Sequence, residues 1–276
     1  MAAFSVNDVM VKYVTLRFPI GEVMFIRGIM TVALMGAAVV ALGYAQQLRF
    51  ALTGRIILRS SLETVAVVCF IVALVHMKLG DLSAVFLVAP LLLTALSVWV
   101  YKEVVGWRRW VAIAVGFAGT LFIVKPTPAA FDVWALVGLA AALFAALRDL
   151  VTRRIDPATP SIVVALMALI AVTLTGLLLG LFEEWRPMPA SDVLRLAIAA
   201  VFIGIAFSLM VIAFRGAETG VVAPFRYAFL LWAMLAGYLA FGEVPDGWAF
   251  VGGALVVGSG LYALHREAVR QHATEG

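Results

Sequence analysis

The chain has 276 residues, of which 64% are hydrophobic and only 13% are charged, with a mean hydropathy of +1.09. A soluble domain is nearer half apolar and a quarter charged, so this composition excludes an ordinary soluble globular protein. The single cysteine, Cys69, excludes an internal disulfide and a metal–thiolate cluster. We interpret the net charge of +4 as the topogenic basic residues of an integral membrane protein, not as a nucleic-acid-binding surface.

Ten apolar segments follow one another along the chain, and we interpret each as a helix that crosses a membrane. Most are close to the ~20 residues that a helix needs to span a hydrocarbon core of about 30 Å. Helices are expected because a segment in lipid must satisfy its own backbone hydrogen bonds. The predicted spans are residues 3–18, 21–43, 56–77, 81–101, 107–125, 132–152, 160–182, 191–214, 219–242 and 246–264. The predicted fold class is an all-α integral membrane protein.

The chain contains the same unit twice. The segment NDVMVKYVTLRFP at 7–19 aligns with RDLVTRRIDPATP at 148–160 at a constant offset of 141 residues. Positions matched at offsets of 141 or 140 are Asp8 with Asp149, Lys12 with Arg153, Pro19 with Pro160, Gly80 with Gly220 and Glu103 with Glu243. We predict two five-helix repeats, residues 1–126 and residues 127–276, the second ending in a short cytoplasmic tail. Because five crossings are an odd number, the repeats are expected to be inverted relative to each other.

Basic residues predict how the chain lies in the membrane. If the N-terminus is cytoplasmic, eleven Lys and Arg residues fall in cytoplasmic segments and six in outside segments, which favours both termini inside. The expected location is a bacterial inner (plasma) membrane. The first helix is expected to be truncated by a turn or two, because the stretch 132–141 of the second repeat has no counterpart before Met1.

Three local motifs add to the repeat pattern. They are NDVMVK at 7–12, RRWVAIAVGFAGTLFIVKP at 108–126 and VAPFRY at 222–227. With the ten-helix inverted repeat, they resemble the EamA family of the drug/metabolite transporter superfamily over almost the whole chain. Within that superfamily the chain is most similar to the branch that contains S-adenosylmethionine and riboflavin carriers. Other members that it resembles export amino acids and related metabolites.

The resemblance implies a secondary transporter that moves a small polar organic metabolite by alternating access around a cavity near the midplane. The substrate class is expected to be similar to S-adenosylmethionine, riboflavin or an amino acid. No HExxH, GxSxG, Walker or dinucleotide motif is present, so we predict no enzyme activity, cofactor, metal site or nucleotide-driven pump. The expected partners are a small-molecule metabolite and the lipid bilayer, with no nucleic acid.

Several properties stay open at this point. Proton coupling through Glu63 or an aspartate, uniport and exchange fit the sequence equally well, and so do a monomer and a weak homodimer. Two other classes of protein are alternatives to a transporter. One is a non-transporting structural or assembly membrane protein, and the other is an intramembrane enzyme that acts on lipid.

Arg226 in the ninth predicted helix is the clearest candidate for substrate binding. An ionisable group within the bilayer costs about 2.5–3.5 kcal/mol on insertion scales, so it usually faces a partner or a wet cavity. With Pro224 before it and Tyr227 after it, Arg226 can grip a carboxylate or phosphate bidentately. The alternative is a structural salt bridge to a neighbouring helix.

Glu63 and Arg59 lie four residues apart on the third predicted helix, so their side chains share one face. Glu63 can bind a cationic group of the substrate or carry a proton. Alternatively, the two side chains only neutralise each other, and Arg59 extends its guanidinium towards the membrane surface.

Two polar pairs at matched positions of the repeats are candidates for alternately opened gates. They are Arg148 with Asp149 at the end of the sixth predicted helix, and Asn7 with Asp8 in the first. Arg27, near the outer end of the second predicted helix, has Asp8 as its expected partner. A packing or capping role for the pairs, and a topological role for Arg27, are the alternatives.

Aromatic residues of the fourth and ninth predicted helices, which are repeat equivalents, can stack on a planar substrate. These residues are Phe86, Trp99, Phe225, Tyr227 and Trp232. The alternative for each ring is core packing or contact with lipid. We interpret Glu103 and Glu243 as caps or interface charges, and the GLLLG segment at 176–180 as a site of close helix packing.

Overall fold

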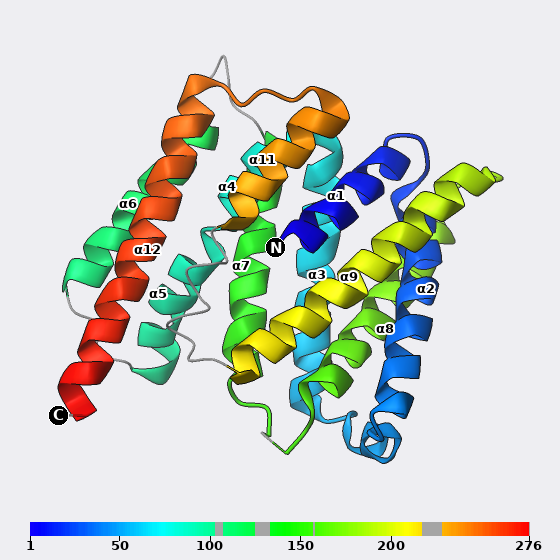
Figure 1. The fold of residues 1–276 in the computed structure, drawn as a ribbon, viewed down its shortest axis with the longest axis horizontal. Helices are drawn as coiled ribbons and strands as arrows, with labels where there is room; N and C mark the ends of the chain where they lie inside the picture. Colours follow the sequence, from blue (N-terminus) through cyan, green and yellow to red (C-terminus); the bar gives the residue numbers. More distant parts are fainter. Residues whose placement is uncertain (103–106, 125–132, 157, 217–227, 276) are drawn as a thin grey trace.

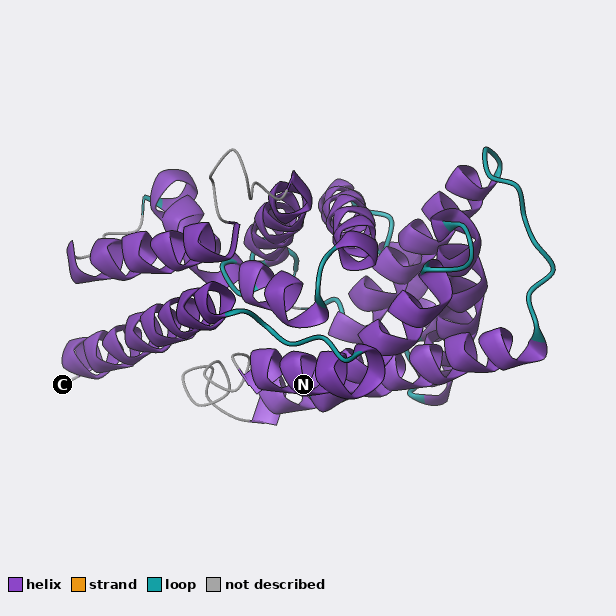
Figure 2. Ribbon diagram, turned by 90° about the horizontal axis from the view of Figure 1, so that it is seen from above, coloured by secondary structure: helices purple, strands orange, loops and turns teal. Residues whose placement is uncertain are grey.

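A computed structural model describes residues 1–102, 107–124, 133–156, 158–216 and 228–275. Every element of regular structure in these ranges is helical, as Figures 1 and 2 show. In chain order the elements are α1 (Ala2–Thr15), α2 (Ile20–Ala41), the 3-10 helix η1 (Ala45–Phe50), α3 (Gly54–His76), α4 (Leu79–Phe86), α5 (Ala89–Tyr101), α6 (Trp107–Val124), α7 (Val133–Thr152), α8 (Ser161–Gly180), α9 (Ala190–Gly216), α11 (Ala228–Phe241) and α12 (Gly247–Glu275).

The predicted all-α, ten-helix fold is confirmed, with one refinement in the fourth span. There α4 ends at Phe86 and α5 begins at Ala89, so the span is a broken helix. Pro90 lies in the first turn of α5, where its missing N–H costs no helical hydrogen bond, and the same residue cannot continue α4. α1 has 14 residues against the 20 of α7, its counterpart in the second repeat.

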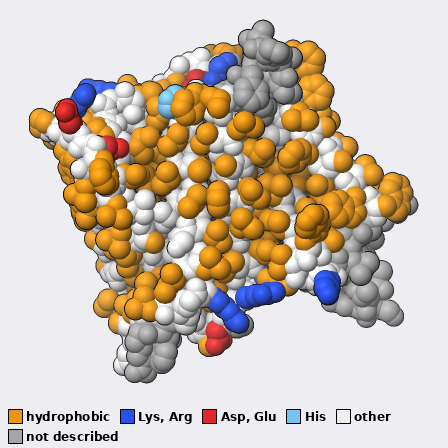
Figure 3. Space-filling view, turned by 180° about the vertical axis from the view of Figure 1, so that it is seen from behind, with side chains coloured by type: hydrophobic (Ala, Val, Ile, Leu, Met, Phe, Trp, Pro, Cys, Tyr) orange, Lys and Arg blue, Asp and Glu red, His pale blue; other side chains and the backbone are white. Residues whose placement is uncertain are grey.

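Five spans are long and apolar enough to cross a bilayer by length and composition. They are Ile20–Ala41, Gly54–His76, Leu79–Tyr101, Val133–Thr152 and Ser161–Gly180. The surface agrees with this assignment: on the face drawn in Figure 3, hydrophobic side chains cover the middle, and charged side chains gather towards the upper and lower edges. A surface of this kind suits contact with lipid between two polar interfaces.

Helix packing in the described residues is reciprocal between the two halves of the chain. α3 packs against α7, and α1 packs against α9. α1 and α7 are the first helices of the two halves, and α3 and α9 are the third. The first helix of each half therefore packs against the third helix of the other half. α2 packs against its equivalent α8, and α6 against its equivalent α12; these two pairs lie on opposite sides of Figure 1. Two related units predict this pattern, and their inversion in the membrane stays a prediction.

Close packing at the predicted GLLLG segment is confirmed. A Cβ atom added at Gly176 would lie 2.8 Å from Met24 Cβ and 2.8 Å from the backbone nitrogen of Phe25, so α8 touches α2 backbone there. At Gly21 on α2, an added Cβ atom would lie 2.5 Å from the backbone nitrogen of Gly180. Glycines therefore let α2 and α8 approach closely, as small residues do in membrane helix pairs.

Candidate functional site

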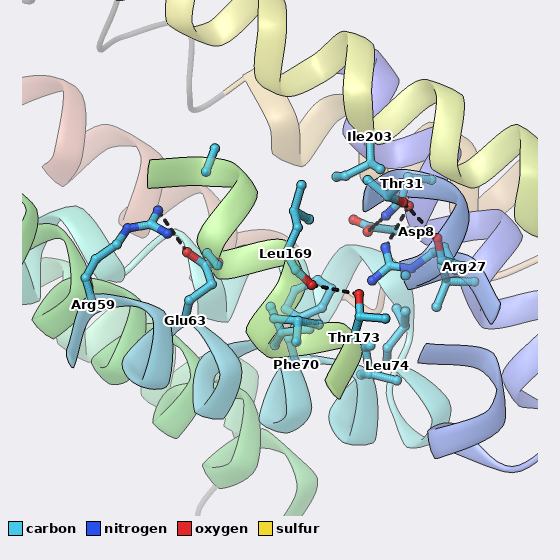
Figure 4. Close-up of a pocket in the computed structure, with 18 residues that line it drawn as sticks. Asp8, Arg27, Thr31, Arg59, Glu63, Phe70, Leu74, Leu169, Thr173 and Ile203 are labelled. Atoms are coloured by element: carbon cyan, nitrogen blue, oxygen red, sulfur yellow. Dashed lines mark hydrogen bonds and ion pairs between the residues drawn. The ribbon is translucent and has the colours of Figure 1, made fainter. Parts of the chain in front are cut away.

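A cavity lies between the two halves and has two adjoining lobes. The first lobe, drawn in Figure 4, has a volume of about 140 Å³ and is lined from α1, α2, α3, α8 and α9. The second has about 210 Å³ and is lined from α1, α3, α4, α5, α7 and α11, together with Leu87 between α4 and α5. Four residues line both lobes: Asp8, Glu63, Val67 and Phe70.

A charged cluster joins α3 to α7 at one end of the cavity. Glu63 Oε1 accepts a hydrogen bond of 2.9 Å from Arg148 Nη1, and Glu63 Oε2 lies 3.1 Å from Arg59 Nη2 in an ion pair. Arg148 also donates from Nε to Asp149 Oδ1 at 2.9 Å. The cluster holds two positive and two negative side chains. The opposite charges pair with one another. This pairing lowers the free-energy cost of burying four ionisable groups in apolar helices, because an unpaired charge there would be far more costly.

A second polar cluster joins α1 to α2. Asn7 Nδ2 donates to Asp8 Oδ1 at 2.9 Å, and Arg27 Nη1 donates to Asn7 Oδ1 at 3.0 Å. Arg27 was expected to pair with Asp8, and the structure instead places the Asn7 amide between them. An amide suits this position because it accepts from the guanidinium through oxygen and donates to the carboxylate through nitrogen.

The two clusters repeat one local arrangement. In each, a side chain hydrogen-bonds the aspartate that follows it, Asn7 to Asp8 in α1 and Arg148 to Asp149 in α7. Each pair is also bound by a charged residue from another helix. In Figure 4, Arg59 and Glu63 lie at one end of the first lobe and Asp8 and Arg27 at the other.

Apolar side chains separate the charged ends. Phe70, Leu169 and Thr173 lie between them in Figure 4, and the Thr173 hydroxyl is committed to the carbonyl of Leu169 at 2.7 Å. In the second lobe Phe86 contacts Phe70 edge to face, with ring centroids 5.2 Å apart. The cavity therefore offers charge at its ends and apolar surface in its middle.

Most of the predicted site residues in the described ranges meet at this cavity. Those that line it are Asn7, Asp8, Arg27, Arg59, Glu63, Phe86 and Arg148, and Asp149 is held beside it by Arg148. Trp99 and Trp232 do not reach it: 81% of Trp99 and 46% of Trp232 is exposed on the outer surface. Arg226, Tyr227 and Phe225 lie outside the described residues.

One buried polar group was missed as a site residue. Lys12 on α1 is only 4% exposed, donates from Nζ to the carbonyl of Met77 at 2.6 Å and forms an ion pair with Glu243. Glu243 also accepts from the backbone nitrogen of Leu79, the first residue of α4, at 2.7 Å; its predicted role as a cap or interface charge at the end of the ninth predicted helix stays a prediction. The repeat alignment held a signal, because Lys12 and Glu243 both have charged equivalents, Arg153 and Glu103.

Comparison with known proteins assigns the family. The profile of the EamA-like transporter family matches residues 1–125 and 132–264, which is nearly the whole chain. The chain belongs to the EamA-like transporter family. Members of this family are transporters and not enzymes, and this EamA-like chain is accordingly an integral membrane protein of transporter class.

Curated relatives of this EamA-like chain are distant but match it over most of their length. The riboflavin transporter of Vibrio cholerae is 28% identical over 92% of this chain and 87% of the relative. The S-adenosylmethionine uptake transporter of Rickettsia prowazekii is 24% identical over 95% of this chain and 89% of the relative. The pseudopaline exporter of Pseudomonas aeruginosa is 27% identical over 92% of this chain and 89% of the relative. A crystal structure 19% identical superposes with a TM-score of 0.65 over 98% of this chain and 96% of the other, and supports the fold.

Proposed function

We propose that this EamA-like protein is a secondary transporter that moves a small polar organic metabolite across a bacterial inner membrane by alternating access. The observation that carries the proposal is the cavity between the two halves, with charged clusters at its ends and apolar surface between them. A metabolite with polar ends and an apolar body fits such a site. The names of the relatives point to substrates similar to riboflavin, S-adenosylmethionine or pseudopaline.

The proposed mechanism is a rocking of two inverted repeats, residues 1–126 and 127–276, around the cavity. The reciprocal packing of α1 on α9 and α3 on α7 supports it, because one motion can loosen one contact while it tightens the other. The pairs Asn7–Asp8 and Arg148–Asp149 are proposed to guard opposite ends. We propose that both termini are cytoplasmic, as the basic residues favour, and that a single chain is sufficient for transport.

Arg59, Glu63, Arg148 and Arg27 are proposed to contact substrate, since their charged groups line the cavity. Arg226 with Tyr227 stays a proposed anchor for an anionic group of the substrate. Glu63 and Asp8 are the proposed sites of any proton coupling, because both are acidic and line both lobes.

Counterflow in proteoliposomes tests the proposal. Vesicles preloaded with unlabelled S-adenosylmethionine, riboflavin or an amino-acid mixture should accumulate the matching labelled solute transiently and saturably, and empty vesicles should not. The same uptake measured with and without a pH gradient decides whether protons are coupled. Correctly folded protein that exchanges no small metabolite would refute the proposed transport activity.

A further inference from the structure

Arg59 is a buried guanidinium with donors left over. Its side chain is 12% exposed and lines the first lobe of the cavity. Its Nη2 lies 3.1 Å from Glu63 Oε2, but that contact does not have hydrogen-bond geometry, since Glu63 Oε2 has no hydrogen-bond partner in the described residues. The Nε and Nη1 atoms of Arg59 are buried as well and have no partner among those residues.

Buried donors of this kind are costly to leave without an acceptor, and nearly all buried polar groups in native proteins have one. The neighbouring acids do not supply it. Glu63 accepts its hydrogen bond from Arg148, and Asp149 accepts from the same Arg148 at 2.9 Å. Arg148 thus contacts two carboxylates, whereas Arg59 lines the cavity with two buried N–H groups that have no partner among the described residues. An acceptor from outside the described residues would satisfy these donors.

We propose that Arg59 binds a carboxylate of the transported metabolite, which makes it the residue that selects carboxylate-bearing substrates. This inference rests on the transport function proposed above and names the substrate class of the same cavity. A guanidinium forms strong, charge-assisted hydrogen bonds with a carboxylate. At the far end of the lobe, Asp8 accepts one hydrogen bond, at Oδ1 from Asn7, and offers an acidic surface to an amine.

The charge balance of the cavity favours a substrate that carries both a carboxylate and an amine. Three basic and three acidic side chains line or flank it: Arg27, Arg59, Arg148, Asp8, Glu63 and Asp149. A lone anion would add an uncompensated charge to a site in the membrane, which is unfavourable. A carboxylate and an amine on one molecule, as in an amino-acid moiety, leave the net charge unchanged.

Ligand pairs that differ only in the carboxylate test the inference. The probes are S-adenosylmethionine with its decarboxylated form, and L-methionine with the amine that lacks its carboxylate. Binding to purified protein in lipid nanodiscs is measured by thermal stabilisation and by titration. The wild-type protein should bind at least one carboxylate member about 10-fold more tightly than its partner, as expected for one charge-assisted contact.

Arg59→Gln should remove this discrimination within the pair while leaving the affinity for the decarboxylated member nearly unchanged. The variant should fold, because Glu63 keeps its hydrogen bond to Arg148. Arg59→Lys, which keeps the charge, should restore part of the preference. The matched control is Arg55→Gln, one turn earlier on α3, whose exposed side chain donates to the carbonyl of Arg154 at 2.7 Å and does not line the cavity.

The inference is wrong if no carboxylate member binds more tightly than its partner, or if Arg59→Gln weakens both members equally. Counterflow of the same solutes separates this failure from failure of the proposed function. A wild-type protein that exchanges riboflavin but ignores the carboxylate is still a transporter, with a different substrate class. One that exchanges no solute, while binding the pairs with the predicted preference, is a binding protein whose transport role is refuted.

Discussion

Glu63 on α3 and Arg148 on α7 are joined by a hydrogen bond of 2.9 Å that crosses from the first half of the chain to the second. The two residues are 85 positions apart in the sequence. Both line the second lobe of the cavity, so the bond that ties the halves together also forms part of the wall that a substrate would meet. One buried ion pair therefore holds two helices together and lines the candidate site.

Glu63→Gln should destabilise the protein and stop transport. The substitution keeps the shape of the side chain but leaves Arg59 and Arg148 with one carboxylate, Asp149, between them. Loss of one partner from a buried pair costs about 3–5 kcal/mol, part of which can be recovered by water in a polar cavity. Thermal unfolding in nanodiscs should show a lower midpoint. The double variant Glu63→Gln/Arg148→Gln should lose less than the sum of the two single variants, and strict additivity would contradict the coupling.

Asn7→Ala should weaken the cluster at the other end of the cavity. It removes the amide that accepts from Arg27 and donates to Asp8, so both charged groups lose a buried hydrogen bond. The expected loss of stability is about 1–3 kcal/mol, with a reduced transport rate. Ser5→Ala is the matched control on α1: Ser5 is fully buried and its hydroxyl has no partner among the described residues. Equal effects of the two substitutions would argue against the bridge.

Gly176→Ala should destabilise the contact between α2 and α8. The added methyl would lie 2.8 Å from Met24 Cβ, so backbone or side chain must shift, which costs about 1–3 kcal/mol. Gly36→Ala is the contrasting variant, because no atom lies within 4 Å of its added Cβ and the change favours helix. Thermal unfolding of both proteins checks the sign: the first midpoint should fall and the second should stay or rise.

Lys12→Gln should open the end of the bundle that Lys12 closes. The ion pair with Glu243 and the bond to the Met77 carbonyl tie α1 to the segments before α4 and after α11. If these two contacts favour a closed conformation over one in which this end of the cavity is open by about 1.4 kcal/mol, their loss raises the population of the open conformation about tenfold. A cysteine placed in the first lobe measures how often this end opens. The variant is Leu74→Cys in a Cys69→Ala background, since Leu74 is buried and lines that lobe.

A membrane-impermeant thiol reagent added from outside should label that cysteine faster in the Lys12→Gln protein. The charge-swapped protein, Lys12→Glu with Glu243→Lys, should return towards the slow rate because it keeps an ion pair. Identical labelling rates in all three proteins would show that this contact is not a closure.

The helices of this protein could be predicted because hydropathy and length are local properties of the sequence. The Arg59–Glu63 contact could be predicted for the same reason, since residues four apart share a helix face. The bond between Glu63 and Arg148 could not, because it depends on how α3 and α7 pack. The expected Arg27–Asp8 pair named two members of the cluster correctly. It omitted the Asn7 amide that lies between them, because sequence spacing does not reveal it.

Trp99 and Trp232 lie on the outer surface, which agrees with the alternative of contact with lipid, and the sequence could not decide between the two for a physical reason. Both lie on helices that are apolar almost all round, so periodicity does not separate the face towards the cavity from the face towards lipid. Phe86 was predicted by the same argument and does line the cavity. The broken fourth span also needed the structure, because Pro90 is compatible with either a kink or a continuous membrane helix.

The most direct test of the account is whether transport passes through this cavity. Ala168 on α8 is buried and lines the first lobe, so Ala168→Trp should fill it without displacing a charged group. Leu174→Trp on the same helix places the same ring on the outer surface, where Leu174 is 54% exposed. With both proteins folded, we expect counterflow to be abolished in the first and retained in the second. Wild-type counterflow through Ala168→Trp would contradict the central claim.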